Sequence, residues 1–171
     1  MDIKDKELHR IALTAIIYNK EGKYLITRRA LTKKAFPGKW TVPGGGLNVD
    51  DYINTPPKTA TSPQWYYALT NTLKREVKEE ANVEIDNLEY LLDLTFIRPD
   101  SVPVLVLSYF AKYKNGEIKY DEDTIDSAWV TPREAKKYDL IEGILEEIEM
   151  VDTILKKRKK ATGVKKKIAK K

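Results

Sequence analysis

Residues Arg75-Glu76-Val77-Lys78-Glu79-Glu80, read together with Pro43-Gly44-Gly45-Gly46, point to both the fold and the chemistry of this chain. If residues 68–81 are helical, Glu76, Glu79 and Glu80 stand at i, i+3 and i+4 and share one face. Like charges at this spacing destabilise an isolated helix by roughly 0.2–0.5 kcal/mol. Mg²⁺ relieves such repulsion, because it binds a few carboxylates together with substrate phosphates. The glycines would let backbone approach a phosphate or a metal closely, so we expect metal-assisted chemistry on a phosphorylated substrate.

The residue types present exclude several other chemistries. The chain has 171 residues, no cysteine and one histidine, His9. The lack of cysteine excludes disulfides, thiolate catalysis and Cys-ligated metal sites. A single histidine excludes His-rich metal sites and makes a Ser-His-Asp triad improbable. Carboxylates, Lys, Arg, Tyr, backbone groups and a bound metal must then supply the chemistry.

The charge of the chain is unevenly distributed. The formal net charge is +5, yet residues 156–171 hold ten Lys/Arg and no Asp/Glu. The preceding 155 residues are therefore mildly acidic. Basic runs of this kind are usually disordered and solvated, and they attract polyanions in a salt-dependent way. We expect one domain over residues 1–155 and a disordered basic tail over 156–171, with weak contact to nucleic acid.

The N-terminal sequence MDIKDKELHR lacks the apolar core of a signal peptide. No apolar run approaches the ~20 residues needed to span a bilayer. We therefore expect a cytoplasmic protein with no membrane partner. A homodimer is left open.

Strands outnumber helices in the pattern of apolar residues. Turn signals at Asn19–Gly22 and Asn115-Gly116 favour hairpins. Strands are predicted over Ile11–Asn19, Tyr24–Arg29, Trp40–Val42, Glu89–Ile97, Val102–Tyr113, Glu117–Tyr120 and Ile125–Val130. This pattern predicts an α+β or mixed α/β sandwich, with helices packed on a largely mixed sheet.

Three helical signals accompany these strands. Leu69, Leu73, Val77 and Ala81 form an apolar stripe along residues 68–81, and Asn82 fits a left-handed helix cap. Residues 131–134 (TPRE) read as a capping box with Pro at the first helical position. An amphipathic pattern over residues 141–155 predicts a final helix that closes the core.

The chain resembles the Nudix (MutT-like) hydrolase family, whose pattern is G-x5-E-x7-R-E-U-x-E-E-x-G-U, with U a bulky aliphatic residue. Its second half is filled by Arg75, Glu76, Val77, Glu79, Glu80 and Val83, and its leading glycine is matched by Gly45. The resemblance covers about residues 10–150 and implies an α/β/α sandwich with a mixed sheet.

The chain departs from the family pattern at three places. The distance from Gly45 to Arg75 is too long, so an insertion within about residues 47–64 interrupts the box. The first glutamate is missing: Asp51 takes its place when counted from Gly45, and Tyr67 when counted back from Arg75. Asn82 replaces the final glycine. These departures put substrate choice in more doubt than activity, because the metal-binding half is intact.

The resemblance implies roles for particular residues. Glu76, Glu79 and Glu80 are expected to hold Mg²⁺ or Mn²⁺, with the backbone carbonyl of Gly44 or Gly45 completing the shell, and Arg75 is expected to orient a glutamate. Glu122 or Asp123 fits the position of a further acidic ligand from a late loop. The residues expected to meet the substrate are Arg28, Arg29, Gly45 and Gly46, with Lys33, Lys34, Phe36 and Trp40 as further candidates.

The implied activity is hydrolysis of a phosphoanhydride in a nucleoside diphosphate linked to another moiety. A nucleoside triphosphate, a nucleotide sugar, a dinucleoside polyphosphate and a capped RNA end all satisfy this description. The alternative is a catalytically weak Nudix-like module that senses a nucleotide or associates with RNA through its basic tail. The absence of cysteine argues against an isopentenyl-diphosphate isomerase.

Overall fold

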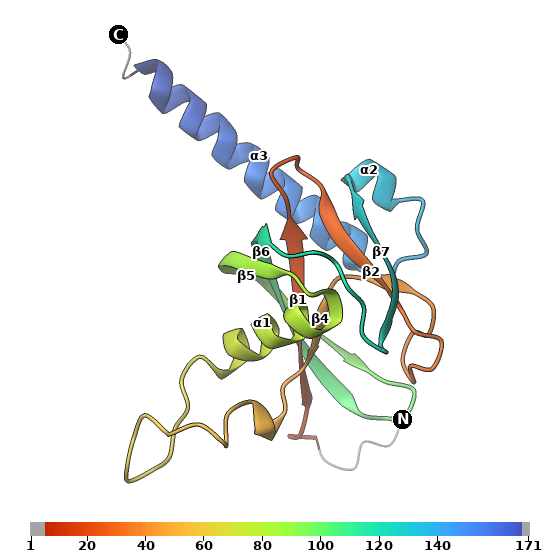
Figure 1. Ribbon diagram of the computed structural model, residues 1–171, viewed down its shortest axis with the longest axis vertical. Helices are drawn as coiled ribbons and strands as arrows, with labels where there is room; N and C mark the ends of the chain where they lie inside the picture. Colours follow the sequence, from red (N-terminus) through yellow and green to blue (C-terminus); the bar gives the residue numbers. More distant parts are fainter. Residues whose placement is uncertain (1–5, 169–171) are drawn as a thin grey trace.

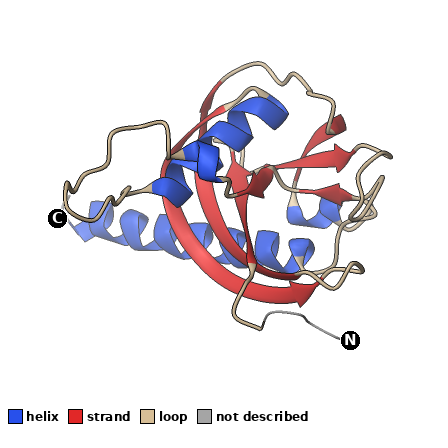
Figure 2. Cartoon of the chain, turned by 90° about the horizontal axis from the view of Figure 1, so that it is seen from below, coloured by secondary structure: helices blue, strands red, loops and turns tan. Residues whose placement is uncertain are grey.

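A computed structural model describes residues 6–168, and side chains as far as residue 162. It is a seven-stranded sheet with helices on both faces (Figures 1 and 2). The elements are β1 (Arg10–Tyr18), β2 (Tyr24–Arg29), β3 (Trp40–Thr41), β4 (Gly44–Gly46), the 3₁₀ turn η1 (Val49–Asp51), α1 (Ala68–Ala81), β5 (Glu84–Ile97), β6 (Pro103–Asn115), β7 (Thr124–Val130), α2 (Pro132–Ala135) and α3 (Ile144–Ile168). The expected α+β sandwich is confirmed.

The sheet is mixed, as expected. Its main order is β3-β2-β1-β6-β5, with β4 pairing to β1 and β7 pairing to β2. Strands β1 and β6 are parallel, and the other pairs are antiparallel. Because β1 pairs with both β4 and β6, the glycine strand lies beside the centre of the sheet and close to α1.

Alternation along β1 sends successive side chains to two separate cores. Leu13, Ala15 and Ile17 pack against α1, whereas Ile16 on the opposite face packs among residues of α3. Figure 2 shows α1 and α3 on opposite sides of the curved sheet. Each helix therefore covers one face, and the polar side of α1 is free to carry chemistry.

The predicted helix over residues 68–81 matches α1 at both ends. Its apolar stripe is buried at Leu73, Val77 and Ala81. Asn82 caps the helix in the left-handed region, with φ 53°, and its side-chain amide donates to the Glu117 carbonyl at 2.8 Å. This geometry explains why Asn can replace the family's glycine there.

The predicted strand over residues 117–120 is wrong. This segment forms no strand and crosses the end of α1 instead, where the Lys119 amide donates to the Ala81 carbonyl at 3.3 Å. A side chain at Gly116 would come within 2.4 Å of the Asn82 carbonyl oxygen, so glycine is needed for this close approach. The end of α1 thus pairs with the Lys119 amide and the Glu117 carbonyl, two backbone groups that a hairpin would have paired with β6.

The final helix extends further than predicted. The apolar pattern ends near Leu155, but α3 continues through the basic segment to Ile168; disorder of this segment stays a prediction. Figure 1 shows this part of α3 projecting well beyond the sheet. No helix within residues 6–168 combines the length and apolar character needed to cross a bilayer.

The insertion forms a loop that extends away from the domain between η1 and α1 (Figure 1). It begins with a capping box: the side chain of Asn48 accepts a hydrogen bond from the backbone of Asp51, and the side chain of Asp51 accepts one from the backbone of Asn48. The Trp65 ring packs against Tyr52 at 5.4 Å, and its indole nitrogen donates to the Thr55 carbonyl at 2.7 Å. These contacts lie within the inserted segment, while β4 and α1 contact each other directly.

Candidate active site

The glycine strand β4 lies directly against the carboxylate side of α1. The Gly44 amide donates to Oε2 of Glu80 at 2.9 Å. A Cβ atom on Gly44 would lie 2.1 Å from the Leu13 carbonyl oxygen on β1, so only glycine lets β4 sit this close. The glycine run thus brings a backbone donor to a glutamate 36 positions further along the chain.

The other two glycines leave room for charged side chains. A Cβ atom on Gly45 would lie 2.1 Å from the carboxyl carbon of Glu76, and one on Gly46 would lie 2.4 Å from Nη2 of Arg10. The Glu76 carboxylate therefore fills the space beside Gly45. Gly45 and Glu76 come together as the sequence predicts, whereas Gly46 faces Arg10, a contact that the sequence did not indicate.

Arg75 organises the acidic residues of α1. Its Nη2 lies 2.8 Å from Oε1 of Glu76, and its Nη1 lies 2.5 Å from Oε2 of Glu79. These charge-assisted hydrogen bonds orient both carboxylates, which is the positioning role that we expected of Arg75. They also offset the repulsion between neighbouring glutamates on one helix face.

Asp51 supplies a third carboxylate to Arg75 across the insertion. Arg75 Nε donates to Oδ1 of Asp51 at 2.8 Å, and the other oxygen of Asp51 accepts from Thr72 Oγ1 at 2.9 Å and from the Asn48 amide at 2.8 Å. Burial acts to raise the pKa of Asp51, but the hydrogen bonds from Asn48, Thr72 and Arg75 outweigh it, so its pKa is lowered.

Asp51 is thus the candidate for the family's first glutamate that contacts Arg75. Of the two residues that counting allowed, Tyr67 is 77% exposed and lies at the start of α1 in the left-handed region.

Glu80 is a half-buried carboxylate that lies against the glycine strand. Its pKa is raised to about 7: burial is the largest cause and the nearby charges of Glu76 and Asp121 add to it, whereas the Gly44 amide and Arg29 act in the opposite direction. A carboxylate that is buried among other carboxylates is costly when ionised unless a cation lies nearby. A nearby cation would therefore stabilise the ionised form of Glu80.

The late acidic loop also brings Asp121, a neighbour of the two residues that we named, towards Glu80. Asp121, rather than Glu122 or Asp123, is the loop residue whose charge acts on Glu80. Its Oδ1 accepts from the backbone amides of Asp123 and Thr124 at 2.9 and 3.0 Å, which holds the carboxylate in place. Sequence spacing cannot separate adjacent residues of a loop, so nothing in the pattern favoured Asp121.

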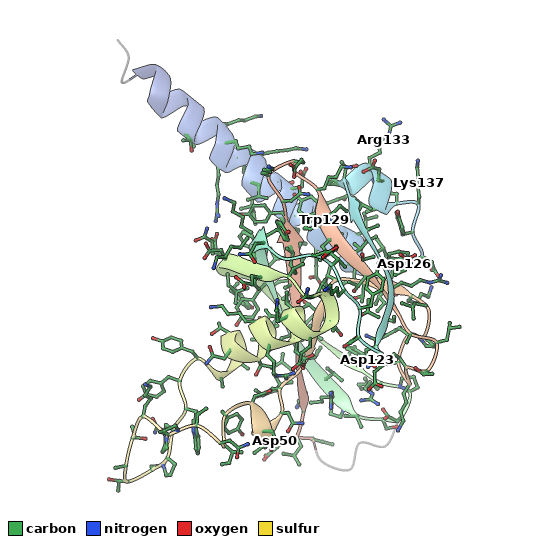
Figure 3. The ribbon with its side chains drawn as sticks, viewed as in Figure 1. Asp50, Asp123, Asp126, Trp129, Arg133 and Lys137 are labelled. Atoms are coloured by element: carbon green, nitrogen blue, oxygen red, sulfur yellow. The ribbon has the colours of Figure 1, made fainter. Side chains whose placement is uncertain are left out.

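The two predicted acidic ligands, Glu122 and Asp123, are not among the charges that act on Glu80. Asp123, labelled in Figure 3 just before β7, forms an ion pair with Lys33 at 2.5 Å, and its charge also acts on Arg29. Glu122 is exposed, and it makes no ion pair within the part of the chain that the structure describes. Their role as ligands stays a prediction.

The two arginines at the end of β2 point to opposite faces. Arg29 lies on the α1 face, where its Nε donates to the Ala35 carbonyl at 3.0 Å and its charge acts on Glu80. Burial lowers the pKa of Arg29, which the charges of Glu80 and Asp123 partly offset. Arg28 is exposed on the other face and donates to the Gly38 carbonyl at 3.1 Å. Of these two arginines, only Arg29 has a charge that acts on Glu80.

The aromatic candidates also differ in placement. Trp40 packs edge-on against Tyr138 with ring centroids 4.7 Å apart, within the core under α3. Phe36 is 40% exposed and lies 6.1 Å from the Phe96 ring. Phe36 is therefore the more accessible ring for contact with a base.

The donor set fits a hard divalent cation. Within residues 6–168 no three Asp, Glu or His side chains stand ready as a metal-ligand cluster, because Arg75 holds Glu76 and Glu79. Glu76 and Glu80 nevertheless both lie against the glycine strand, Glu80 at the Gly44 amide and Glu76 in the space beside Gly45. Carboxylate and carbonyl oxygens are the ligands that Mg²⁺ and Mn²⁺ prefer.

Residues 8–149 match the family model described as the NUDIX domain. This chain belongs to the Nudix family. The glutamates of α1, the glycine strand and Arg75 lie within the matched region, and the match confirms the resemblance that the motif indicated.

Known proteins of the family are similar over most of the chain. Nucleoside triphosphatase NudI of Escherichia coli K12 is 26% identical over 142 residues, which cover 77% of this chain and 88% of NudI. The crystal structure of a MutT protein from Methanosarcina mazei Go1 superposes with a TM-score of 0.66 at 21% identity, covering 90% of this chain and 99% of the other.

A Nudix domain of Shewanella oneidensis NrtR, solved with ADP ribose, has a TM-score of 0.67 at 19% identity and covers 91% of this chain and 94% of that domain. These structures share the fold. Together with the family match, the similarity to NudI indicates a Nudix pyrophosphohydrolase.

Proposed function

We propose that the protein is a divalent-metal-dependent nucleotide pyrophosphohydrolase that cleaves a phosphoanhydride bond. The observation that carries the proposal is the contact between the Gly44 amide and Glu80, 2.9 Å long, beside Glu76 and Gly45. It joins the glycine strand to the glutamate helix at the place where a cation and a pyrophosphate would meet. NudI is named as a nucleoside triphosphatase, and a nucleoside triphosphate is the substrate class that this similarity favours.

The glutamates of α1 and two arginines have different roles in this proposal. Glu76, Glu79 and Glu80 would hold Mg²⁺ or Mn²⁺, and the backbone of Gly44 or Gly45 would add an oxygen donor. Such an ion, when bound, neutralises pyrophosphate and activates water for in-line attack. Arg75 fixes the orientation of Glu76 and Glu79. Arg29 lies close enough to act on the charge of Glu80 and supplies a positive group for a phosphate.

Glu80 is also placed to act on a proton. Burial raises its pKa to about 7, and a group with such a pKa can accept and release a proton near neutral pH. A bound cation would lower this pKa, because an adjacent positive charge favours the ionised form. A homodimer, a cytoplasmic location and the choice among nucleotide substrates stay predictions.

The test is release of phosphate and pyrophosphate from a panel of nucleoside triphosphates, nucleotide sugars and dinucleoside polyphosphates, with and without Mg²⁺ or Mn²⁺. Glu80→Gln should lower kcat by about 100-fold or more, because it removes a charge that acts on the reacting centre. Glu117→Gln, at an exposed position, is the matched control. Equal turnover of Glu80→Gln and the control would refute the proposed site. No turnover by the native protein, in a sample that still binds a nucleotide, would favour a sensor.

A further inference from the structure

The side chain of Arg10, at the start of β1, lies against the glycine strand. A Cβ atom on Gly46 would lie 2.4 Å from Nη2, 3.0 Å from Cζ and 3.3 Å from Nε of Arg10. The guanidinium group therefore occupies the space that any other residue at position 46 would fill with its own side chain. Gly46 thus lets a positive charge lie directly on the strand that also carries Gly44 and Gly45.

The backbone at Gly46 does not itself require glycine. Its φ lies outside the left-handed region, unlike that of Gly22, Gly38, Gly116 and Gly143. Glycine within a strand also lowers stability relative to alanine, because it loses more conformational freedom on folding. What glycine provides at position 46 is room for the guanidinium group of Arg10.

Arg10 and Glu76 approach the glycine strand from opposite faces of the sheet. Gly45 is paired with Leu13 of β1, and Gly46 is paired with Ala12. Leu13 belongs to the core that packs against α1, and Glu76 fills the space beside Gly45 on that face. Successive residues of a strand face opposite sides, so Arg10 lies on the other face of β4.

The free edge of β4 is common to both faces. Within the described residues β4 pairs with β1 alone, and the Gly44 amide donates to Oε2 of Glu80 at 2.9 Å rather than to β1. Alternate residues of a strand direct their backbone groups to the same edge, so Gly46 faces the edge at which Gly44 meets Glu80. Gly44 and Gly46 are about 7 Å apart along the strand. A chain of two or three phosphates that begins at Glu80 and follows this edge ends beside Arg10.

The charge of Arg10 is not neutralised by the protein around it. Arg10 is exposed, and within residues 6–168 no carboxylate lies within ion-pair distance of it. The other cations near the site are engaged: Arg75 contacts three carboxylates. Lys33 forms an ion pair of 2.5 Å, and the charge of Arg29 acts on Glu80. Arg10 is therefore available to an anion that binds at the edge of β4.

We propose that Arg10, lying on Gly46, is a substrate-binding residue that holds one phosphate of the nucleotide while a neighbouring phosphate lies at the glutamates of α1. This role rests on the proposed function, and it selects substrates by the length of their phosphate chain. A guanidinium group presents its N–H donors in a planar fork that matches two phosphate oxygens. Linked phosphates reach from Glu80 to Arg10, whereas a single phosphate occupies only one of these places. Di- and triphosphates therefore bind more tightly than monophosphates.

The first experiment measures how nucleotide affinity depends on the number of phosphates. Mono-, di- and triphosphate forms of one nucleoside, with methylene groups in place of the bridging oxygens to prevent turnover, are titrated into the full chain with Mg²⁺ by calorimetry. In Arg10→Gln the gain in affinity from the monophosphate to the triphosphate should fall roughly 10-fold or more, as expected when a hydrogen bond to a charged group is lost. Arg10→Lys keeps the charge but not the fork, so its gain should lie between the two.

Arg133→Gln is the matched control, because Arg133 is exposed and points outward from α2 (Figure 3). An equal loss in this control, or an undiminished gain in Arg10→Gln, would overturn the proposal. So would a lower urea midpoint of Arg10→Gln with unchanged affinities, which would assign Arg10 to packing. Native protein that binds the analogues with the expected gain but hydrolyses no nucleotide would contradict the proposed function alone. Native protein that binds none of the analogues would overturn both.

The second experiment tests the contact between Gly46 and the guanidinium group. In Gly46→Ala the atoms nearest to the new methyl group all belong to the flexible side chain of Arg10, which can move away, so the protein should fold normally. Affinity for the triphosphate analogue should fall, and KM for a hydrolysed nucleotide should rise with little change in kcat. Arg10→Gln should add little to Gly46→Ala, because both substitutions remove the same contact. Losses that add fully in the double variant would overturn the proposed arrangement.

Discussion

Asp51 and Arg75 stand on opposite sides of the inserted loop, yet two nitrogens of Arg75 contact one oxygen of Asp51, Nε at 2.8 Å and Nη2 at 2.7 Å. The side chain of Asp51 is only 6% exposed. This ion pair therefore ties together the two ends of the insertion. Arg75 in turn orients Glu76 and Glu79, so Asp51 positions the glutamates indirectly.

Asp51→Asn should lower kcat by roughly 10- to 100-fold, because removing a partner that orients ligands has effects of that size. The free energy of unfolding should fall by about 1–3 kcal/mol, since Arg75 loses a hydrogen-bonded partner. Turnover and urea denaturation measure the two effects. Asp50→Asn is the matched control, because Asp50 is the exposed neighbour in the same turn (Figure 3). A rise in the metal concentration needed for activity would distinguish a positioning role from a purely structural one.

Gly44 and Gly45 should respond differently to alanine. In Gly44→Ala the new methyl group meets backbone at 2.1 Å, and we expect a loss of about 2 kcal/mol or more in stability. In Gly45→Ala it meets the carboxylate of Glu76, a side chain that can move aside. That variant should keep nearly normal stability and lose most of its turnover. Thermal unfolding and kinetics of both variants check this contrast, and a severe loss of stability in Gly45→Ala would contradict it.

Asp121→Asn should raise the Mg²⁺ concentration for half-maximal activity by roughly 10-fold, as loss of a charge near metal ligands does. Asn keeps an oxygen that can accept from the amides of Asp123 and Thr124, so the loop should keep its shape. Metal titrations of Asp121→Asn, Glu122→Gln and Asp123→Asn show which acid of the loop matters. Asp126→Asn, exposed on β7, is the control. If Glu122→Gln raised the required Mg²⁺ concentration more than Asp121→Asn did, the prediction that Asp121 matters most would be wrong.

Glu147 on α3 gives a prediction about pH and stability. It is 4% exposed, and within the described residues its Oε2 has no hydrogen-bond partner. Burial raises its pKa, which a hydrogen bond to Ser108 partly offsets and the charge of Glu146 increases. A raised pKa in the folded state means that the favourable contribution is complete below the unfolded pKa and is lost as pH rises.

Glu147→Gln should therefore stabilise the protein at pH 7 by roughly 1 kcal/mol or more, since it removes a buried charge with an unsatisfied oxygen. The difference from the native protein should shrink as pH falls towards about 4, where even the unfolded chain's glutamate becomes mostly protonated. Urea denaturation between pH 4 and 8 measures it. Glu146→Gln, the exposed neighbour, should show no such trend. A difference that grows in acid would contradict the sign.

The local pattern of the sequence determined the elements that carry the chemistry. The bounds of α1, the common face of its glutamates and the cap at Asn82 follow from 3.6-residue periodicity and from the φ that Asn tolerates. The capping box before α2 is equally local. All of these depend on residues within one or two turns of one another, which is why they can be predicted from the chain alone.

Tertiary structure decided which distant groups meet. Asp51 faces Arg75 only because the insertion closes on itself, and Asp121 acts on Glu80 only because a loop after β6 reaches the end of α1. The basic segment of α3 is tied to β5 through Arg158 and Glu89, a contact between residues 69 positions apart. Periodicity fixes the face on which a side chain lies, but not its partner across the fold, because that choice depends on the path of the whole chain.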